Sequence, residues 1–242
     1  MYYVDNDNKP ACFVKGFFSE LHKIAEYDGV FSYDNLAEGF TPDMEVDFDE
    51  WDDTLYKMLS KSENLTELEN LFIGDSYFEL WCNKEYCGKD FYEIFDNAKN
   101  LNMGVGGTRF SEWKRFIYKL NKLSIPKRIF VNLGFNDIHC GRSADIVFND
   151  CIEFINLLNK RFPQARIYLL NIVKAPSMTE YYLEEEKFNA LTKAAADNHG
   201  IRIVDMRSQI APTSNVFHSD RLHLNARGYE YLINEIERIL KA

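Results

Sequence analysis

Short apolar segments alternate with amphipathic segments from residue 66 onward, and this alternation limits the possible fold more than any other feature. The apolar segments resemble strands buried on both faces, and they cover 70–73, 98–103, 128–133, 166–173 and 201–206. Apolar residues at helical spacing fill the gaps, at 111–123, 145–161, 183–199 and 226–240. Gly200 follows the third of these helical segments and predicts its C-cap. The order predicts an α/β fold, a doubly wound parallel sheet with right-handed crossovers.

The first 66 residues do not follow this alternation. The apolar stretches 13–18 and 29–33 predict one or two short strands, and 49–60 has the spacing of a helix. A segment of this length is short for a core of its own. We therefore expect residues 1–66 to form an N-terminal extension packed on a main domain of residues 67–242.

The chain is acidic, with a formal net charge of -10 over 242 residues. This balance disfavours nucleic acid and anionic membrane surfaces as partners, because there is no excess of Lys and Arg to neutralise phosphates. The densest acidic run, at 43–53, is typical of a solvated surface. It lacks the glycine and the spacing of a calcium-binding EF-hand loop.

The five cysteines follow no disulfide framework and no metal-binding pattern. Cys82 and Cys87 are five positions apart, and no second Cys or His pair has metal-ligand spacing. We therefore expect no metal and no cofactor. Neither a signal peptide nor a stretch with the length of a membrane helix is recognisable. These observations predict a cytoplasmic protein with reduced thiols and no insertion into a membrane.

Four polar clusters follow predicted strands, at the edge where open parallel sheets bind ligands. Gly-Asp-Ser at 74–76 follows the first strand, 102–107 the second and 134–137 the third, while 220–223 precedes the last helix. The glycine of the first cluster permits a sharp turn that would place the serine near the start of a helix. Each cluster alone is explained as well by a turn, a flexible loop, a helix cap or surface residues. Their joint occurrence at one edge predicts a functional site.

These clusters contain the groups that acyl transfer requires. Ser76 is the candidate nucleophile, and His223 is the candidate base because imidazole titrates near neutral pH. Asp220, three residues earlier, is placed to accept from Nδ1 of the imidazole and to leave Nε2 for the serine. The backbone N–H groups of Ser76 and Gly107, with the side-chain amide of Asn136, are the candidate oxyanion hole.

Other polar residues near these clusters are weaker candidates. His218 is the main rival base, although Asn215 stands where an orienting Asp would be needed. His139 follows the third polar cluster and is a candidate for the pocket lining. The remaining candidates for the pocket lining are Asp75, Tyr77 and Arg109.

Together these segments resemble the SGNH hydrolases, also called the GDSL esterase/lipase family, over about residues 68–242. The signature residues of that family correspond to Ser76, Gly107, Asn136 and His223, with Asp220 as the third member of the triad. The stretches 101–107 and 220–229 are most similar to the branch of platelet-activating-factor acetylhydrolase catalytic subunits and bacterial acetyl esterases. The resemblance implies a flavodoxin-like three-layer α/β/α sandwich with five parallel strands. It also implies metal-independent ester hydrolysis at a shallow, exposed site.

The sequence departs from the family pattern in two places. Tyr77 stands where the family name has leucine, at a position that varies in this branch, and Phe78 removes the G-x-S-x-G elbow of α/β-hydrolases. Residues 1–66 match no part of the family core. Because they could shape the acyl or the alcohol pocket, the substrates of relatives do not transfer directly to this chain.

We therefore expect a serine esterase that removes a short acyl group, in the first place acetyl, through an acyl-enzyme. The resemblance and the lack of a long apolar lid favour carbohydrate O-acetyl esters as substrates. A lipid or thioester acylhydrolase is the alternative among enzymes, since the Phe- and Tyr-rich N-terminal region could supply an acyl channel. A non-catalytic glycan-binding module is the alternative outside enzymes, and the intact Ser, His, Asp and Asn set argues against it. Assembly into a homo-oligomer stays open.

Overall fold

The computed structural model describes residues 57, 59–60, 62, 65 and 67–241. The N-terminal extension, including the short strands expected in it and most of the expected helix 49–60, lies outside the described residues. The boundary between extension and main domain therefore stays a prediction.

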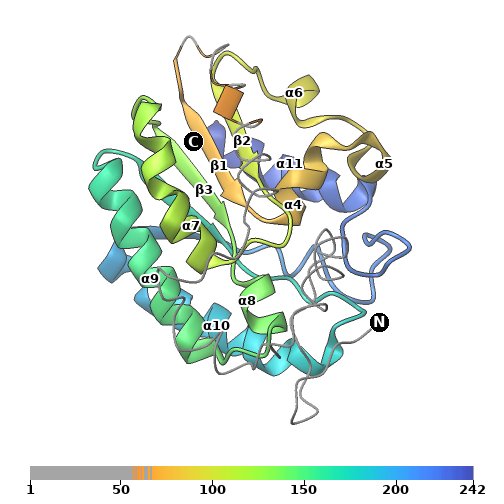
Figure 1. Cartoon of the computed structure of the whole chain (residues 1–242). Helices are drawn as coiled ribbons and strands as arrows, with labels where there is room; N and C mark the ends of the chain where they lie inside the picture. Colours follow the sequence, from red (N-terminus) through yellow and green to blue (C-terminus); the bar gives the residue numbers. More distant parts are fainter. Residues whose placement is uncertain (1–56, 58, 61, 63–64, 66, 242) are drawn as a thin grey trace, which may run out of the picture.

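Strands and helices alternate along the described part of the chain, as the apolar pattern predicts (Figure 1). The strands are β1 (Asn70–Gly74), β2 (Asn100–Gly104), β3 (Arg128–Asn132), β4 (Arg166–Leu170) and β5 (Ile201–Val204). The α-helices are α4 (Ser76–Glu79), α5 (Lys84–Cys87), α6 (Phe91–Ile94), α7 (Phe110–Phe116), α8 (Phe135–His139), α9 (Ala144–Arg161), α10 (Tyr182–Ala195) and α11 (Ala226–Leu240).

The strands form one parallel sheet in the order β2-β1-β3-β4-β5. This is the flavodoxin-like order, so the predicted fold class is confirmed. The chain runs outward from β1 to β2 and then returns past β1 to β3, and the switch in direction falls between β1 and β3. A crevice for ligands is expected at the carboxyl ends of these two strands, where Gly74 lies beside Asn132.

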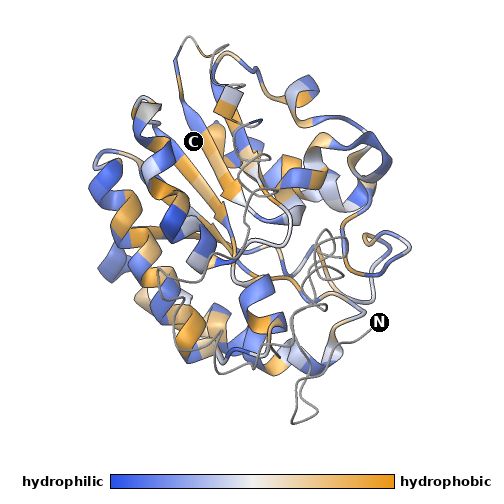
Figure 2. Cartoon of the chain, viewed as in Figure 1, coloured by the Kyte–Doolittle hydropathy of each residue, from blue (hydrophilic) through white to orange (hydrophobic). Residues whose placement is uncertain are grey.

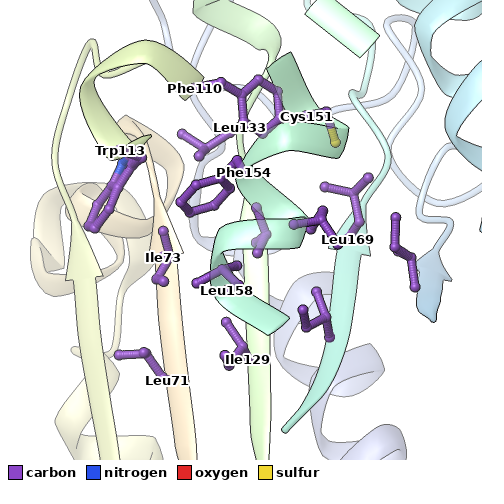
Figure 3. Packing of buried hydrophobic residues seen from close by; sticks show 14 of the residues in the cluster. Leu71, Ile73, Phe110, Trp113, Ile129, Leu133, Cys151, Phe154, Leu158 and Leu169 are labelled. Carbon is purple, nitrogen blue, oxygen red and sulfur yellow. The ribbon is translucent and has the colours of Figure 1, made fainter. Parts of the chain in front are cut away.

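The two faces of the sheet carry different cores, because successive residues of a strand point to opposite faces. One face is mainly aliphatic and includes Leu71 and Ile73, which pack with residues of α7 and α9 (Figure 3). The other face is aromatic: the Phe72 and Phe130 rings are stacked at 4.8 Å, and Tyr168 continues the stack at 5.0 Å. Residues of α4, α6 and α11 cover this second face. Figure 2 shows strands that are mainly hydrophobic and helices in which hydrophobic and hydrophilic residues alternate.

Two expected helices end differently from the prediction. The segment 111–123 is α-helical only to Phe116 and continues to Lys122 as a 3-10 helix. Arg161 donates to the carbonyl oxygens of Leu120 and Leu123 at the end of this turn, and the Leu120 carbonyl also accepts from the Leu123 N–H. Helix α10 likewise gives way to a 3-10 turn. That turn ends at Gly200 in the left-handed conformation (φ 65°), as its place in the sequence predicts.

Two findings concern the expectations drawn from composition. Cys140 is disulfide-bonded whereas Cys82, Cys87 and Cys151 are free, so the prediction of reduced thiols is wrong for Cys140. Among the described residues, no helix combines the length and the apolar character needed to cross a membrane.

Candidate active site

Ser76 is the first residue of α4, directly after the carboxyl end of β1. Asp75 caps this helix by accepting a hydrogen bond from the backbone N–H of Tyr77 at 3.0 Å. The glycine before it is needed for space and not for an unusual backbone angle. A Cβ on Gly74 would lie 2.7 Å from the Phe78 ring and 3.0 Å from the Asn132 carbonyl oxygen, whereas its φ is not positive. Glycine is thus required here because there is no room for a Cβ beside Phe78 and Asn132, and not because the turn needs a positive φ.

A continuous chain of hydrogen bonds links Ser76 to His223 and Asp220. The distance from His223 Nε2 to Ser76 Oγ is 3.1 Å, and the distance from His223 Nδ1 to Asp220 Oδ2 is 2.8 Å. With Nδ1–H donating to the carboxylate, Nε2 is left as the acceptor for the serine hydroxyl. The structure therefore brings the three predicted residues together in the predicted order.

The carboxylate of Asp220 is held in its charged form. Burial by itself would raise its pKa, but the hydrogen bonds from His223 Nδ1 and from the backbone N–H groups of Leu222 and His223 outweigh burial. The pKa of Asp220 consequently lies below its ordinary value. A permanent negative charge beside Nδ1 is what an imidazole needs when it takes up a proton at Nε2.

The loop that carries Asp220 and His223 is fixed from several sides. The His218 N–H donates to the His223 carbonyl at 2.7 Å, and a β-bridge joins Phe217 to Leu224. Arg221 takes a positive φ of 58° inside this turn. The Tyr77 hydroxyl donates to the Leu222 carbonyl at 2.8 Å and ties the loop to α4. These bonds hold base and nucleophile in one frame.

The end of β2 and the glycine loop after it lie against α4. A Cβ on Gly104 would lie 2.2 Å from the Glu79 backbone nitrogen, so only glycine permits this approach. A Cβ on Gly106 would lie 3.7 Å from Ser76 Cβ, and the next residue, Gly107, has a φ of 75°. The loop therefore runs beside the nucleophile, as the sequence predicts.

Asn136 comes from the segment after β3, as the second residue of α8. Its Nδ2 donates to the Thr108 carbonyl at 3.0 Å, which joins the loop after β3 to the glycine loop. An amide carries two N–H bonds, and among the described residues only Thr108 accepts from the Asn136 side chain. Asn136 does not cap α8, because Gly134 holds the N-cap position.

Asp75 is buried directly behind the nucleophile. Burial raises its pKa to about 7, against the hydrogen bonds from the Tyr77 N–H and from Asn132 Nδ2. Asp75 and Tyr77 also line a small cavity of about 20 Å³ whose other walls are mainly apolar. That volume fits about one water molecule. Both residues therefore lie in the predicted pocket region, but they face inward from the nucleophile.

His139 and Arg109 have partners of their own. His139 Nε2 lies 3.0 Å from Oε1 of the buried Glu185, and its ring lies between those of Phe135 and Tyr181. Arg109 forms a two-point ion pair with Glu112, at 2.8 and 3.1 Å. The structure therefore directs the Arg109 guanidinium to its own helix rather than to the nucleophile.

His218 lies beside the triad but does not bond to the serine. Its Nδ1 is 3.2 Å from the Ser219 hydroxyl, and its ring packs on Tyr86 at 4.5 Å. Tyr86 also contacts the His223 ring edge-on, at 5.9 Å. Sequence reasoning missed Tyr86 because α5 is too short to show a periodicity. It also missed Asn132, whose place at the carboxyl end of β3 was the available signal.

No cluster of three or more His, Cys, Asp or Glu side chains suited to a metal ion occurs in the described part of the chain. The groups that the structure brings together at this edge of the sheet are the Ser76 hydroxyl, the His223 imidazole and the Asp220 carboxylate.

Comparison with known proteins agrees with this arrangement. The sequence profile of the GDSL-like Lipase/Acylhydrolase family matches residues 72–231, a span that contains Ser76, Gly107, Asn136 and His223. Platelet-activating factor acetylhydrolase IB subunit alpha1 of Homo sapiens is 29% identical over 170 residues, which are 69% of this chain and 70% of that protein.

Solved structures share the fold at lower identity. A member of the lipolytic protein G-D-S-L family from Veillonella parvula DSM 2008 has a TM-score of 0.60 at 19% identity, covering 72% of this chain and 98% of its own. A carbohydrate esterase family 3 protein from Talaromyces cellulolyticus has a TM-score of 0.55 at 14% identity, covering 72% and 96%. The family profile spans well over half of the chain. The chain therefore belongs to the GDSL-like lipase/acylhydrolase family and is an ester hydrolase.

Proposed function

We propose that the protein is a serine esterase in which Ser76, His223 and Asp220 form the catalytic triad. The observation that carries the proposal is the unbroken chain of hydrogen bonds from Ser76 Oγ through both ring nitrogens of His223 to Asp220. The rival base, His218, has no hydrogen bond to the serine, and its Nδ1 contacts Ser219.

The first half of the reaction forms an acyl-enzyme. Ser76 Oγ attacks the ester carbonyl carbon while His223 Nε2 takes the hydroxyl proton, and Asp220 stabilises the resulting imidazolium through Nδ1–H. The backbone N–H groups of Ser76 and Gly107 and the amide of Asn136 donate to the oxyanion. The bond to the alcohol oxygen then breaks, and that oxygen receives the proton from Nε2.

The second half releases the acyl group. A water molecule gives a proton to His223 Nε2 as its oxygen attacks the carbonyl carbon of the acyl-enzyme. The same donors bind the second oxyanion. When it collapses, the bond to Ser76 Oγ breaks, the serine regains its proton from Nε2 and the carboxylic acid leaves.

We assign a short acyl group, acetyl, to this site. The 29% identical human relative is named an acetylhydrolase, which favours the same acyl group here. For the alcohol we assign a carbohydrate, a choice supported by the fold shared with a carbohydrate esterase.

Labelling with a fluorophosphonate tests the nucleophile, because this reagent phosphonylates activated serines. We expect labelling of the wild-type protein and none of Ser76→Ala. Ser219→Ala removes a neighbouring serine outside the relay and is the matched control, which should label normally. Well-folded wild-type protein that takes up no label would exclude the esterase and favour a glycan-binding module.

A series of p-nitrophenyl esters from acetate to decanoate tests the acyl group. We expect kcat/KM to be highest for acetate and to fall with each lengthening of the chain. A maximum at octanoate or longer would overturn the acetyl assignment in favour of a lipid or thioester acylhydrolase.

A lipid alcohol is the second candidate, because the human relative is named for platelet-activating factor. Comparing an acetylated sugar with an acetylated phospholipid as substrates separates the two alcohols while keeping the acyl group constant.

A further inference from the structure

An aromatic pair that the triad does not use lies next to the candidate base. Tyr86 from α5 and His218 from the loop before α11 pack with ring centroids 4.5 Å apart and planes tilted by 34°. The Tyr86 ring also meets the His223 ring edge-on, at 5.9 Å and 88°. Two segments far apart in the sequence thus place a phenol and an imidazole beside the group that handles the proton.

The polar ends of this pair are available to a ligand. Within the described residues, the Tyr86 hydroxyl has no hydrogen-bond partner, and His218 uses only Nδ1, toward Ser219. Both side chains are half-buried, so one part of each ring packs against protein and another part meets solvent. An apolar ring surface with a few hydrogen-bonding groups at its edge is the usual composition of a small-molecule site.

The backbone that carries the pair is fixed in advance. Asn83 caps α5 through the Glu85 N–H at 3.0 Å, and at the other end of α5 a Cβ on Gly88 would lie 3.2 Å from Ala226 Cβ of α11. His218 is bonded through its N–H to His223 and through its carbonyl oxygen to the Arg221 N–H at 2.8 Å. A rigid frame of this kind lowers the entropy that a ligand must overcome on binding.

The path of the proton indicates which part of the ester lies beside Tyr86 and His218. In the proposed reaction the alcohol oxygen receives its proton from His223 Nε2, so that oxygen must come within hydrogen-bond reach of this nitrogen. Groups that flank His223 are therefore placed to contact the alcohol part, while the carbonyl oxygen of the ester points to the oxyanion donors. The position of Tyr86 and His218 makes them neighbours of the leaving alcohol.

We propose that Tyr86 and His218 form a binding subsite for the alcohol part of the substrate, and that this alcohol is a saccharide. The C–H face of a sugar ring packs on the Tyr86 ring, and sugar hydroxyls bond to the phenol oxygen and to His218 Nε2. This inference rests on the proposed esterase function and deepens it by naming the residues that select the alcohol.

Two acetyl esters with different alcohols test the subsite. We compare kcat/KM for a mono-O-acetylated methyl xyloside and for ethyl acetate in the wild type and in Tyr86→Ala, Tyr86→Phe and His218→Ala. Tyr86→Ala should lower kcat/KM for the sugar ester by about 10- to 100-fold, mainly through KM, with less than about a twofold change for ethyl acetate. His218→Ala and Tyr86→Phe should lower it by about 3- to 10-fold, again for the sugar ester alone.

Tyr118→Ala is the matched control, because Tyr118 is an exposed tyrosine in the segment that leads into the opposite, amino end of β3. It should leave both substrates unchanged. If Tyr86→Ala lowered kcat/KM equally for both esters, the ring would only orient His223. If it lowered kcat/KM for neither ester, the ring would make no contact that matters for binding. Either result overturns the subsite.

The rate of fluorophosphonate labelling, measured on the same variants, separates a failure of the alcohol subsite from a failure of the esterase function. Normal labelling of Tyr86→Ala demonstrates a folded protein with an intact nucleophile, so any selective loss belongs to the alcohol subsite. Absence of labelling in the wild type would refute the esterase itself and the subsite with it.

Discussion

Two histidine–carboxylate pairs lie near the carboxyl edge of the sheet, and they look alike in distance. His223 Nδ1 is 2.8 Å from Asp220, and His139 Nε2 is 3.0 Å from Glu185. The two carboxyl groups differ in charge: Asp220 is ionised, and Glu185 keeps its proton. The pKa of Asp220 is lowered, whereas burial raises the pKa of Glu185 to about 8 and lowers that of His139 to about 3.

The difference comes from what surrounds each carboxyl group. Asp220 accepts two backbone N–H bonds besides the imidazole, so its negative charge is solvated by the protein. Glu185 is fully buried, and its Oε2 has no hydrogen-bond partner among the described residues. Of the charges near it, Lys174 favours ionisation, while Glu180 and Glu186 oppose it. The second pair is therefore neutral, with the Glu185 carboxyl donating to His139.

The length of the hydrogen bond between a histidine and a carboxyl group therefore does not identify a pair that can transfer a proton. In the proposed mechanism the pair at Asp220 carries an extra proton during the reaction. The pair at Glu185 excludes charge and joins α8 to α10. Three predictions test this contrast, in order of decreasing effect.

The largest effect is expected from removing the charge of each carboxylate in turn. Asp220→Asn should lower kcat on p-nitrophenyl acetate by about 10³- to 10⁴-fold, because His223 loses its orienting anion and adopts the wrong tautomer. Glu185→Gln should lower it by less than about threefold, because the amide keeps a donor for His139 Nε2. Similar losses in both variants would contradict the contrast.

A smaller effect is expected on α8, which carries Asn136 near its start and His139 at its end. Asn136→Ala should lower kcat by about 10²- to 10³-fold with little change in KM, because an oxyanion donor acts only in the transition state. His139→Phe keeps an aromatic ring between Phe135 and Tyr181, and it should cost less than about tenfold. If the two substitutions changed kcat equally, Asn136 would be no more than a structural residue.

The third prediction concerns stability against pH, where the two carboxyl groups should act in opposite directions. Because the pKa of Glu185 is raised, the folded protein keeps a proton that the unfolded chain releases from about pH 4.5 upward, and stability falls as the pH approaches 8. Glu185→Gln does not titrate, so its stability relative to the wild type should rise between pH 5 and 8, by on the order of a few kcal/mol.

Asp220 should have the reverse sign. Its lowered pKa contributes stability that is present near neutral pH and disappears as the carboxylate takes up a proton in acid. Asp220→Asn should therefore be less stable than the wild type at pH 7, with a deficit that vanishes on acidification. Urea unfolding at a series of pH values measures both trends, and parallel curves for the two variants would refute the assignment.

The sequence predicted most of the fold because the strands are short, apolar and regularly spaced. The triad candidates were predictable for a related reason: Ser76 follows the first strand, and Asp220 and His223 stand three apart in one loop. Topology then brings such clusters to one edge of the sheet. Their roles in catalysis stay proposals until the variants have been measured.

Features that depend on packing between distant segments could not be predicted. Nothing distinguishes Glu185 from Glu184 and Glu186 in the sequence, yet only Glu185 is fully buried. Tyr86 lies in a helix of a single turn, where no periodicity exists. Glu112, three residues after Arg109, forms an ion pair with it at the start of the same helix, while a place for Arg109 in the pocket lining stays a prediction. The cytoplasmic location stays a prediction.

The separation of the nucleophile from its base has a consequence for protein synthesis. Ser76 and His223 are 147 positions apart, and the loop of His223 is fixed partly by Tyr77 and by packing of α11 on α5. At ribosomal rates of about 5–20 residues per second, roughly 7 to 30 s pass between the synthesis of the two residues. Throughout that interval the serine has no base beside it. In the proposed mechanism, activation of Ser76 therefore waits until β5 and the loop after it have folded, because only then does His223 Nε2 lie beside the serine.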